Sequence, residues 1–304
     1  MFLVEYKCFS FVELIMFQGS IVALVTPMNP DGSIDIGKFK SLLDFHIENK
    51  TDGVVVLGTT GECPTVDFDE HTFLIKEAVS HINGRIPVIA GTGANSTKEA
   101  IFLTQSAKEA GADACLLVTP YYNKPNQQGL FQHYKAINDA VNIPQILYNV
   151  PSRTGCDLEN ETVISLSQLK NIIGVKDATG ELERIDFMKG KVKNNFTFIS
   201  GDDLSFLGYM ERGAKAVISV TANVKPDLMH IICNGMLNGD IEKSKNLNKQ
   251  LSNLHKAMFV ESNPIPVKWL MAHLGLINQG IRLPLVELDK KYQKNLIEIF
   301  EAIK

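Results

Sequence analysis

The sequence predicts an α/β chain of the eight-stranded (β/α)8 (TIM) barrel class with a helical appendage at its C-terminal end. Short apolar runs rich in Val and Ile occur eight times from residue 20 onward, and a cluster of Gly, Thr, Asn or Pro follows each run. Stretches with helical spacing of apolar residues separate the runs. Apolar strands joined by helical crossovers indicate a parallel sheet that is covered on both faces. Eight such units in about 200 residues fit a closed barrel better than the alternative, an open doubly wound sheet.

In chain order, the expected strands occupy residues 20–27, 53–60, 87–93, 114–120, 144–150, 172–179, 196–203 and 216–223. Helical spacing between them is clearest at 35–50, 69–82, 96–111 and 129–141, where Asp, Ser or Gly near each start acts as a capping signal. After the last strand the pattern is purely helical, at 226–237, 240–259, 264–276 and 288–303.

This pattern divides the chain into a catalytic barrel over residues 16–238 and a helical region packed on it over residues 239–304. Residues 1–15 form an apolar extension that charged residues interrupt, too short to span a bilayer and without the features of a signal peptide. Met16 is a natural start, so we expect this extension to come from an upstream start codon or an expression vector. The alternative is a genuine docking segment.

Composition excludes several classes of function. The formal net charge is −4 with both signs interspersed, which provides no electrostatic footprint for nucleic acid or an anionic membrane and favours a small-molecule partner. The five cysteines contain no C-x-x-C pair and the seven histidines no H-x-H or H-E-x-x-H spacing. We therefore expect no disulfide framework, no metal, no cofactor and a reducing, cytoplasmic setting.

Lys176 is the most informative single residue. Four apolar residues precede it and "DATG" follows, so it stands at the end of a buried strand, where the active sites of such barrels lie. A surface lysine is the ordinary interpretation of such a residue. If instead its side chain points into the barrel mouth, burial favours a neutral amine, the nucleophile that forms a Schiff base with a carbonyl substrate.

Other strand ends carry polar residues with the same two interpretations. Tyr148, on the preceding strand, is either a core aromatic or a proton shuttle. The "GTTGE" turn, with Thr59 and Thr60, is either a simple turn or a carboxylate cradle. Arg153, just past the fifth strand, is either a surface arginine in a salt bridge or a bidentate ligand for a substrate carboxylate.

Together, "GTTGE", "TPYYNKP", "LYNVPSRTG", "GVKDATG" and "VISVTAN" resemble the dihydrodipicolinate synthase family in the family's own order, from about Met16 to the C-terminal helices. The resemblance implies a lyase of the class I aldolase-like barrels that condenses pyruvate with L-aspartate 4-semialdehyde in diaminopimelate and lysine biosynthesis. It implies that Lys176 forms the pyruvate Schiff base.

The resemblance also assigns roles to the other positions. Tyr148, Thr59 and Tyr122 match a proton-relay triad whose Tyr122 position is supplied by the neighbouring subunit. Thr60 matches the contact to the pyruvate carboxylate, and Arg153 the residue that orients the semialdehyde carboxylate. Gly201 and Ile218 match backbone positions that line the site. A homotetramer, built as a dimer of dimers, is implied, and an isolated monomer should be poorly active.

Many family members are inhibited by lysine bound between subunits, and the matching positions here are His71, Asn95, Glu99 and Tyr121. This sequence departs from the pattern close to them. Phe68 stands where lysine-sensitive bacterial members often carry histidine, and Cys63 and Pro64 replace small residues. We therefore expect weak or absent inhibition by lysine.

Two rival functions could use the same barrel. A sibling lyase would cleave N-acetylneuraminate or a 2-keto-3-deoxy sugar acid through the same Lys176 imine, but "GTTGE", "YYNKP" and "SRTG" favour the synthase. A catalytically dead keto-acid sensor would be expected to lack Lys176 or Tyr148, and both are present.

Overall fold

The computed structural model describes residues 17–303. Its eight parallel strands close into a barrel in which each strand pairs with the next along the chain and the eighth pairs with the first. The strands are β1 (Gly19–Ala23), β2 (Gly53–Val56), β3 (Val88–Gly91), β4 (Ala114–Val118), β5 (Gln145–Asn149), β6 (Ile172–Asp177), β7 (Thr197–Ser200) and β8 (Ala216–Ser219). The closed barrel confirms the predicted fold class and excludes the open sheet. The N-terminal extension at 1–15 lies outside the described residues.

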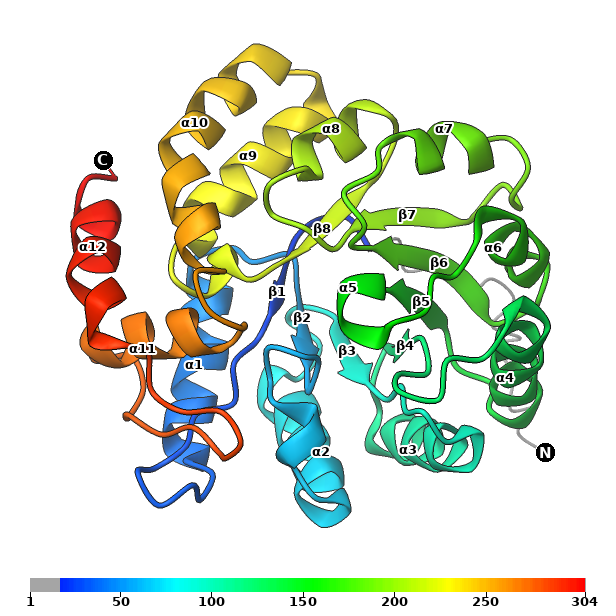
Figure 1. Ribbon diagram of the computed structural model, residues 1–304, viewed down its shortest axis with the longest axis horizontal. Helices are drawn as coiled ribbons and strands as arrows, with labels where there is room; N and C mark the ends of the chain where they lie inside the picture. Colours follow the sequence, from blue (N-terminus) through cyan, green and yellow to red (C-terminus); the bar gives the residue numbers. More distant parts are fainter. Residues whose placement is uncertain (1–16, 304) are drawn as a thin grey trace, which may run out of the picture.

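Helices surround the barrel, as Figure 1 shows. The crossover helices are α1 (Ile36–Glu48), α2 (Phe68–Ile82), α3 (Thr97–Ala110), α4 (Gln127–Ala140), α6 (Asn160–Ser167), α7 (Glu183–Met188), α8 (Phe206–Glu211) and α9 (Pro226–Asn238). The appendage contains α10 (Ile241–Ala257), α11 (Ile265–His273) and α12 (Lys290–Glu301). Short turns η1 (Cys63–Thr65), α5 (Pro151–Thr154) and η2 (Thr221–Asn223) follow strand ends. None of these helices is long and apolar enough to cross a membrane.

Local sequence explains where the longer helices begin. Asp35, Ser96 and Asn126 each precede a helix and accept a hydrogen bond from a backbone N–H of its first turn. Asp67 does the same for α2, and Glu70 returns a bond to the Asp67 backbone, which completes a capping box. Each such cap stabilises its helix by about 1 kcal/mol.

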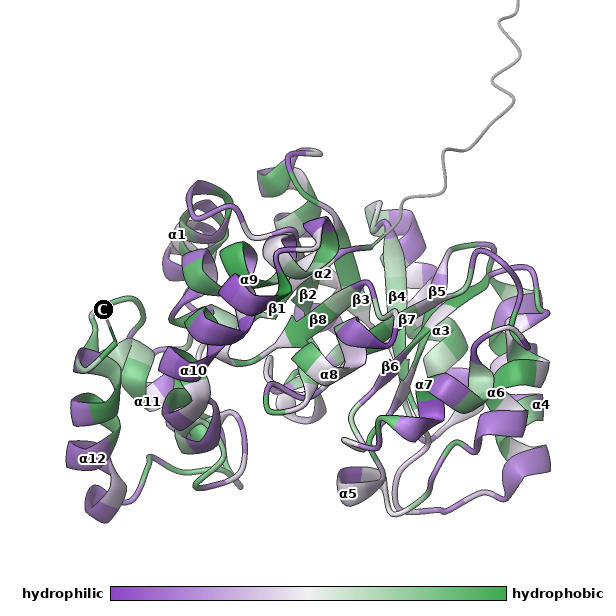
Figure 2. Ribbon diagram, turned by 90° about the horizontal axis from the view of Figure 1, so that it is seen from above, coloured by the Kyte–Doolittle hydropathy of each residue, from purple (hydrophilic) through white to green (hydrophobic). Residues whose placement is uncertain are grey.

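Alternation along the strands separates two layers of core. In β2, Val55 belongs to the cluster that fills the barrel, whereas Val54 and Val56 pack in the layer between sheet and helices. Figure 2 shows hydrophobic strands at the centre, surrounded by helices that carry hydrophilic residues. In β5, Tyr148 belongs to the barrel interior and Leu147 to the outer layer. Because β6 pairs Lys176 with Tyr148, the Lys176 side chain also enters the barrel.

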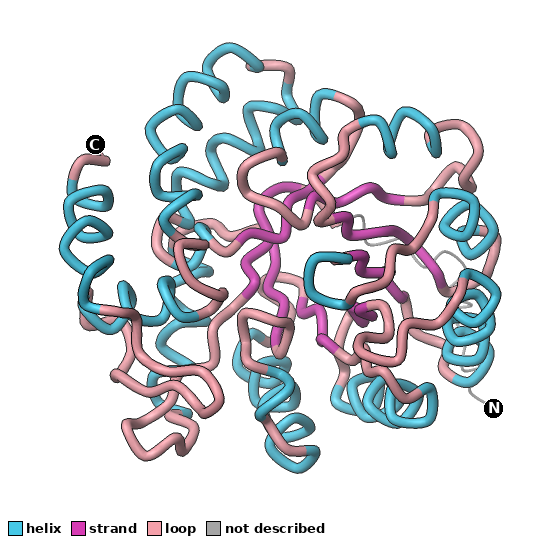
Figure 3. The backbone as a smooth tube through the Cα atoms, viewed as in Figure 1, coloured by secondary structure: helices cyan, strands magenta, loops and turns pink. Residues whose placement is uncertain are grey.

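The appendage lies on the β1 side of the barrel, away from α4 and α6, in both Figure 1 and Figure 2. The longest connections of this region run between α10, α11 and α12, and the short α5 lies over the barrel opening (Figure 3). The loops after the strands and the connection between α10 and α11 therefore meet at one end of the barrel, where the side chains described next gather.

Candidate active site

A cavity of about 220 Å³ opens at the C-terminal ends of the strands. It is lined by Thr59, Thr60, Tyr148, Arg153, Lys176, Gly201 and Ile218 among others. These residues come from the ends of five strands or the loops after them, over a span of 160 positions, and the fold brings all of them to one place. Of the predicted catalytic and substrate-binding residues, only Tyr122 does not line this cavity.

Lys176 lies inside the barrel mouth beside Tyr148. The Lys176 side chain is 5% exposed, and its Nζ lies 4.0 Å from the centre of the Tyr148 ring. The ion pairs that lysines form within residues 17–303 do not include Lys176. A buried primary amine that faces a cavity and is not committed to a carboxylate has the arrangement needed to attack a carbonyl carbon.

Gly201, at the end of β7, provides the space that the Lys176 side chain occupies. A Cβ atom at position 201 would lie 2.9 Å from Cε and 3.1 Å from Cγ of Lys176. These separations are shorter than van der Waals contact, so any larger residue would displace the lysine. Gly201 therefore contributes to the site through the side chain that it lacks.

The loop after β2 presents Thr59 and Thr60 to the cavity. Thr60 is buried, and its Oγ1 accepts a hydrogen bond of 2.9 Å from Nδ2 of Asn263. Because the amide occupies a lone pair of Oγ1, the hydroxyl hydrogen of Thr60 stays available to a carboxylate in the cavity. This geometry suits the predicted carboxylate cradle.

Arg153 projects from α5 at the rim of the same cavity. Its Nη2 donates to the backbone carbonyl of Asn263 at 3.3 Å. The arginines that form ion pairs within the described chain are Arg85, Arg184, Arg212 and Arg282, so Arg153 is not the salt-bridged residue of the ordinary interpretation. Its remaining donors face solvent and cavity, where they can bind an incoming carboxylate.

Asn263 is the site residue that sequence reasoning missed. It lies between α10 and α11, lines the cavity, and contacts both Thr60 and Arg153. Its Oδ1 is buried and has no hydrogen-bond partner within residues 17–303. The only local signal is the turn sequence "SNPIP", which indicates a break between helices and does not indicate its contact with the barrel mouth.

Glu62, at the end of "GTTGE", anchors the threonine loop to the appendage. Its backbone is left-handed, with φ of 58°, and its side chain forms a buried ion pair with Lys268 of α11. The backbone N–H of Arg282 donates to the other carboxylate oxygen at 3.1 Å. Burial lowers the pKa of Lys268, and the Glu62 carboxylate opposes that shift.

Tyr122 and Tyr121 point to different places. Tyr122 is 89% exposed, with a left-handed backbone at φ of 73°, and its ring does not reach the cavity of its own chain. Tyr121 lines a second cavity of about 320 Å³ beside α2 and α3. Burial raises the pKa of the Tyr121 hydroxyl, and nearby Cys63 and Glu99 add to the shift.

The second cavity contains most of the predicted effector positions. His71, Glu99 and Tyr121 line it together with Cys63 and Phe68, whereas Asn95 does not. Asn95 instead accepts a hydrogen bond at its backbone oxygen from Asn123 at 2.8 Å. His71 bonds to the carbonyl of Gly91 at 2.8 Å, so its Nε2 donates, and burial lowers its pKa.

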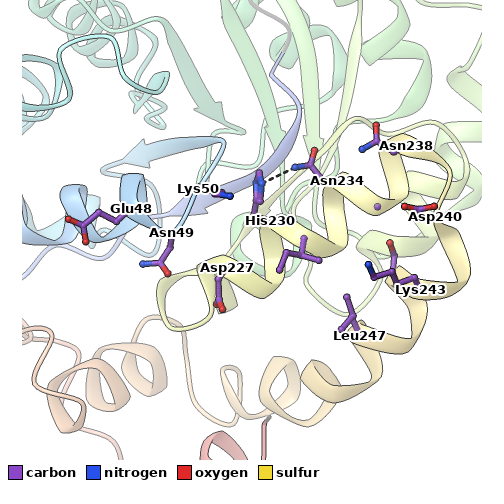
Figure 4. A pocket seen from close by; sticks show the side chains of 13 residues that line it. Glu48, Asn49, Lys50, Asp227, His230, Asn234, Asn238, Asp240, Lys243 and Leu247 are labelled. Atoms are coloured by element: carbon purple, nitrogen blue, oxygen red, sulfur yellow. Dashed lines mark hydrogen bonds between the residues drawn. The ribbon is translucent and has the colours of Figure 1, made fainter.

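A larger cavity, of about 420 Å³, lies on the outside of the barrel between the end of α1 and helices α9 and α10. Figure 4 shows His230 pointing toward Asn234 at this cavity, and His230 Nδ1 lies 3.0 Å from Asp52. Asp52 precedes β2 and binds the backbone of Ser20 in β1, so the cavity is near the opposite end of the strands from Lys176. None of the predicted site residues lines it.

Comparison with known proteins identifies the family. The profile of the dihydrodipicolinate synthetase family matches residues 16–303. A 4-hydroxy-tetrahydrodipicolinate synthase from Nitrosomonas europaea is 57% identical over 92% of this chain and 96% of its own. The dihydrodipicolinate synthase of Acinetobacter baumannii, solved in complex with pyruvate, is 51% identical with a TM-score of 0.92, covering 95% of this chain and 99% of that one.

A third relative bears on assembly. A structure described as the first monomeric dihydrodipicolinate synthase variant is 38% identical to this chain, with a TM-score of 0.92, and the match covers 95% of this chain and 97% of that one. The likeness to all three relatives extends over the whole barrel and the appendage. The chain therefore belongs to the dihydrodipicolinate synthetase family, and its activity is that of a 4-hydroxy-tetrahydrodipicolinate synthase.

Proposed function

We propose that the cavity condenses pyruvate with L-aspartate 4-semialdehyde through an imine on Lys176, a step of the diaminopimelate route to lysine in the cytoplasm. The observation that carries this proposal is the placement of a buried amine, a tyrosine hydroxyl, two threonines and an arginine around one cavity. The amine supplies the nucleophile, and the other groups match two substrates that each carry a carboxylate.

The first half of the reaction activates pyruvate. Lys176 Nζ attacks the ketone carbon, and water leaves as the carbon–nitrogen double bond forms. Tyr148 is the proton shuttle for that step, since the Lys176 Nζ lies against its ring, with Thr59 next in the relay. Thr60 holds the pyruvate carboxylate. The protonated imine withdraws electrons, so the methyl group loses a proton and an enamine forms.

The second half forms the carbon–carbon bond. Arg153 holds the carboxylate of the semialdehyde at the rim, and the enamine carbon attacks the aldehyde carbon, whose oxygen takes up a proton. The amino group of the new chain then attacks the imine carbon. This transimination closes the ring and releases Lys176 as a free amine, so the protein is unchanged after each turnover.

The relay also requires a tyrosine that this chain does not supply to its own cavity. Tyr122 is exposed, and so are Phe68 of α2 and Phe102 of α3, whose rings pack edge to face with centres 5.7 Å apart. Exposed aromatic side chains of this kind are typical of a surface that a partner covers. A second copy that covers this face would bring its Tyr122 to the neighbouring site, and a dimer of such dimers would form the expected tetramer.

The second cavity would lie at the same interface and is the candidate effector site. His71, Glu99 and Tyr121 supply polar groups for an amino acid, but Phe68 and Cys63 make part of the lining apolar. Burial raises the pKa of Cys63 to about 12, so its thiol carries no charge for a lysine ammonium. We expect weak or absent inhibition by lysine, and an inhibition constant like that of sensitive enzymes would contradict this.

The test is pyruvate consumption by the purified protein with and without aspartate semialdehyde, beside a Lys176→Ala control. Turnover that depends on the semialdehyde and is lost in the control supports the proposal. N-acetylmannosamine serves as the alternative acceptor, since activity with it alone would indicate a sibling lyase that uses the same imine. Silence with both acceptors would indicate a keto-acid sensor.

A further inference from the structure

Two buried polar residues stand directly behind the reacting pair. Asn149 follows Tyr148 in β5, and Asp177 follows Lys176 in β6. The two are register partners, and their side chains point out of the barrel into the layer beneath the helices, where Asn149 is fully buried and Asp177 is 3% exposed. A buried carboxylate is costly unless it is paired, so its partners define what it does.

Arg184 of α7 is the centre of these contacts. Its Nε donates to Oδ2 of Asp177 at 3.0 Å, and its Nη1 donates to Oδ2 of Asp157 at 3.0 Å. The other oxygen of Asp157 accepts from Asn149 Nδ2 at 2.6 Å. Asn149, Asp157, Arg184 and Asp177 thus form one connected network across the ends of β5 and β6.

The Asp157 side of the network controls the loop that carries Arg153. Residues 150–156 leave the barrel between Asn149 and Asp157, and Arg153 lies in their middle. The backbone N–H of Leu158 donates to Oδ1 of Asn149 at 3.0 Å, and the Leu158 carbonyl accepts from Arg184 Nη2 at 2.6 Å. Both ends of the loop are therefore tied to the same network.

The Asp177 side controls the end of the lysine strand. Oδ1 of Asp177 accepts bonds from the backbone N–H of Thr179 at 2.8 Å, from the Thr179 hydroxyl at 2.6 Å and from the Tyr209 hydroxyl at 3.0 Å. With Arg184 on its other oxygen, Asp177 binds donors from three segments. These bonds leave the strand end little freedom, and Lys176 is the adjacent residue.

We propose that Arg184 is a positioning residue with two separable effects: through Asp177 it sets Lys176 for imine formation, and through Asp157 it sets Arg153 for the second substrate. This inference rests on the proposed function. It divides the reaction, because imine formation needs pyruvate alone, whereas Arg153 acts only when the semialdehyde binds. A network that served stability alone would not separate the two half-reactions.

The test compares Asp157→Asn and Asp177→Asn in the complete enzyme. An amide at position 157 either places its NH2 group against the NH2 group of Asn149 or leaves Arg184 without a charged partner there. Asp157 is 38% exposed, so folding should tolerate the change. The control is Asp186→Asn on α7, the helix that carries Arg184. Asp186 pairs with Arg212 at 3.0 Å and is 57% exposed. Thermal unfolding confirms that each variant is folded.

Two readouts separate the effects: the rate at which borohydride traps pyruvate on the protein, and the KM for aspartate semialdehyde. Asp157→Asn should raise the KM by up to about 100-fold and leave trapping unchanged, since a misplacement of about 1 Å can cost on the order of 10²-fold. Asp177→Asn should slow trapping. Arg184→Met should show both effects, slower trapping and a higher KM. Arg184→Lys should partly restore one of these two properties and not the other.

Proportional losses of trapping and semialdehyde binding in both variants, or changes no larger than those of Asp186→Asn, would overturn the proposal. If Asp177→Asn does not fold, Asp157→Asn decides alone by the same criterion. Failure of the proposed function would be distinguishable, because the unmodified protein would then neither trap pyruvate nor turn over with the semialdehyde.

Discussion

At the scale of single residues, the chemistry depends on what each buried group can still do after folding. Lys176 and Tyr148 are both nearly inaccessible, and they contact each other through the ring face of the tyrosine. Within residues 17–303, the Tyr148 hydroxyl forms no hydrogen bond. The Tyr134 hydroxyl, in contrast, donates to the Leu117 carbonyl at 3.2 Å. This contrast suggests a matched pair of variants.

Tyr148→Phe keeps the ring beside Lys176 and removes only the proton shuttle. General acid–base catalysis contributes about 10²- to 10⁴-fold to a rate, so we expect kcat to fall by about that factor. Tyr134→Phe removes a buried hydroxyl away from the cavity and serves as the control. Steady-state kinetics measure both, and a similar kcat for the two variants would remove Tyr148 from the relay.

His46 of α1 makes the stability of the protein depend on pH. Burial lowers its pKa to about 3, and its Nδ1 lies 3.0 Å from Thr51 Oγ1. Between its ordinary pKa near 6.5 and its folded value, the unfolded chain binds a proton that the native protein does not. Stability therefore falls as pH falls through this window, by about 1.4 kcal/mol per pH unit for one such group.

The measurement is urea unfolding of His46→Asn and the unmodified protein at matched concentration between pH 6 and pH 4. The variant should lose stability more slowly on acidification, by about 1.4 kcal/mol per pH unit. Equal slopes would show that His46 takes up its proton in the native state.

At the scale of elements, α11 and the segments beside it complete the barrel mouth. We propose that residues 16–238 form the catalytic barrel and that 239–304 form an appendage that fixes its threonine loop. The appendage reaches that loop through Asn263, which contacts Thr60, and through Lys268 and Arg282, which bind Glu62. Glu62 and Lys268 are each less than 5% exposed, so either one alone would be an uncompensated buried charge.

Lys268→Met should therefore destabilise the protein by about 3–5 kcal/mol. Glu62→Gln combined with Lys268→Met should recover much of that loss, since no buried charge is then left unpaired. Lys40→Met is the control, because Lys40 pairs with Glu77 at the surface and should contribute less than about 1 kcal/mol. Denaturant unfolding checks all three, and a double variant as unstable as the single one would refute the explanation.

Elements were easier to predict than the contacts between them. Apolar runs such as 53–60 and 114–120 predicted strands because a strand buried on both faces needs continuous hydrophobic residues, and β2 and β4 begin at or within them. Lys176, Tyr148 and Thr59 were predicted because a strand end is visible locally. Asn263, Lys268 and the Arg184 network were not, since Asn263 meets Thr60 across 203 positions and no periodicity encodes such contacts.

At the scale of the whole molecule, activity should depend on assembly. Phe68 and Phe102 are half-exposed on α2 and α3, and Tyr122 is exposed and absent from the cavity of its own chain. A site completed by a second copy explains all three observations. One relative is described as a monomeric variant, so assembly and activity are measured together in the test that follows.

Phe102→Asp should prevent association, because an unpaired carboxylate in an apolar interface is costly to desolvate, and activity should fall with it. Ile231→Asp is the control, since Ile231 is 45% exposed on α9, across the barrel from α2 and α3 (Figure 1). Sedimentation velocity gives the assembly state and the coupled assay gives the activity. A monomeric variant with full activity would contradict the contribution of Tyr122 from a partner.

The most direct measurement for the whole account is the location of the covalent intermediate. The protein is incubated with pyruvate, reduced with borohydride, digested and analysed by mass spectrometry, with Lys176→Ala in parallel. The account predicts a pyruvate-derived adduct on the peptide that contains Lys176 and none in the variant. An adduct on a different lysine, or no adduct on the unmodified protein, would contradict it.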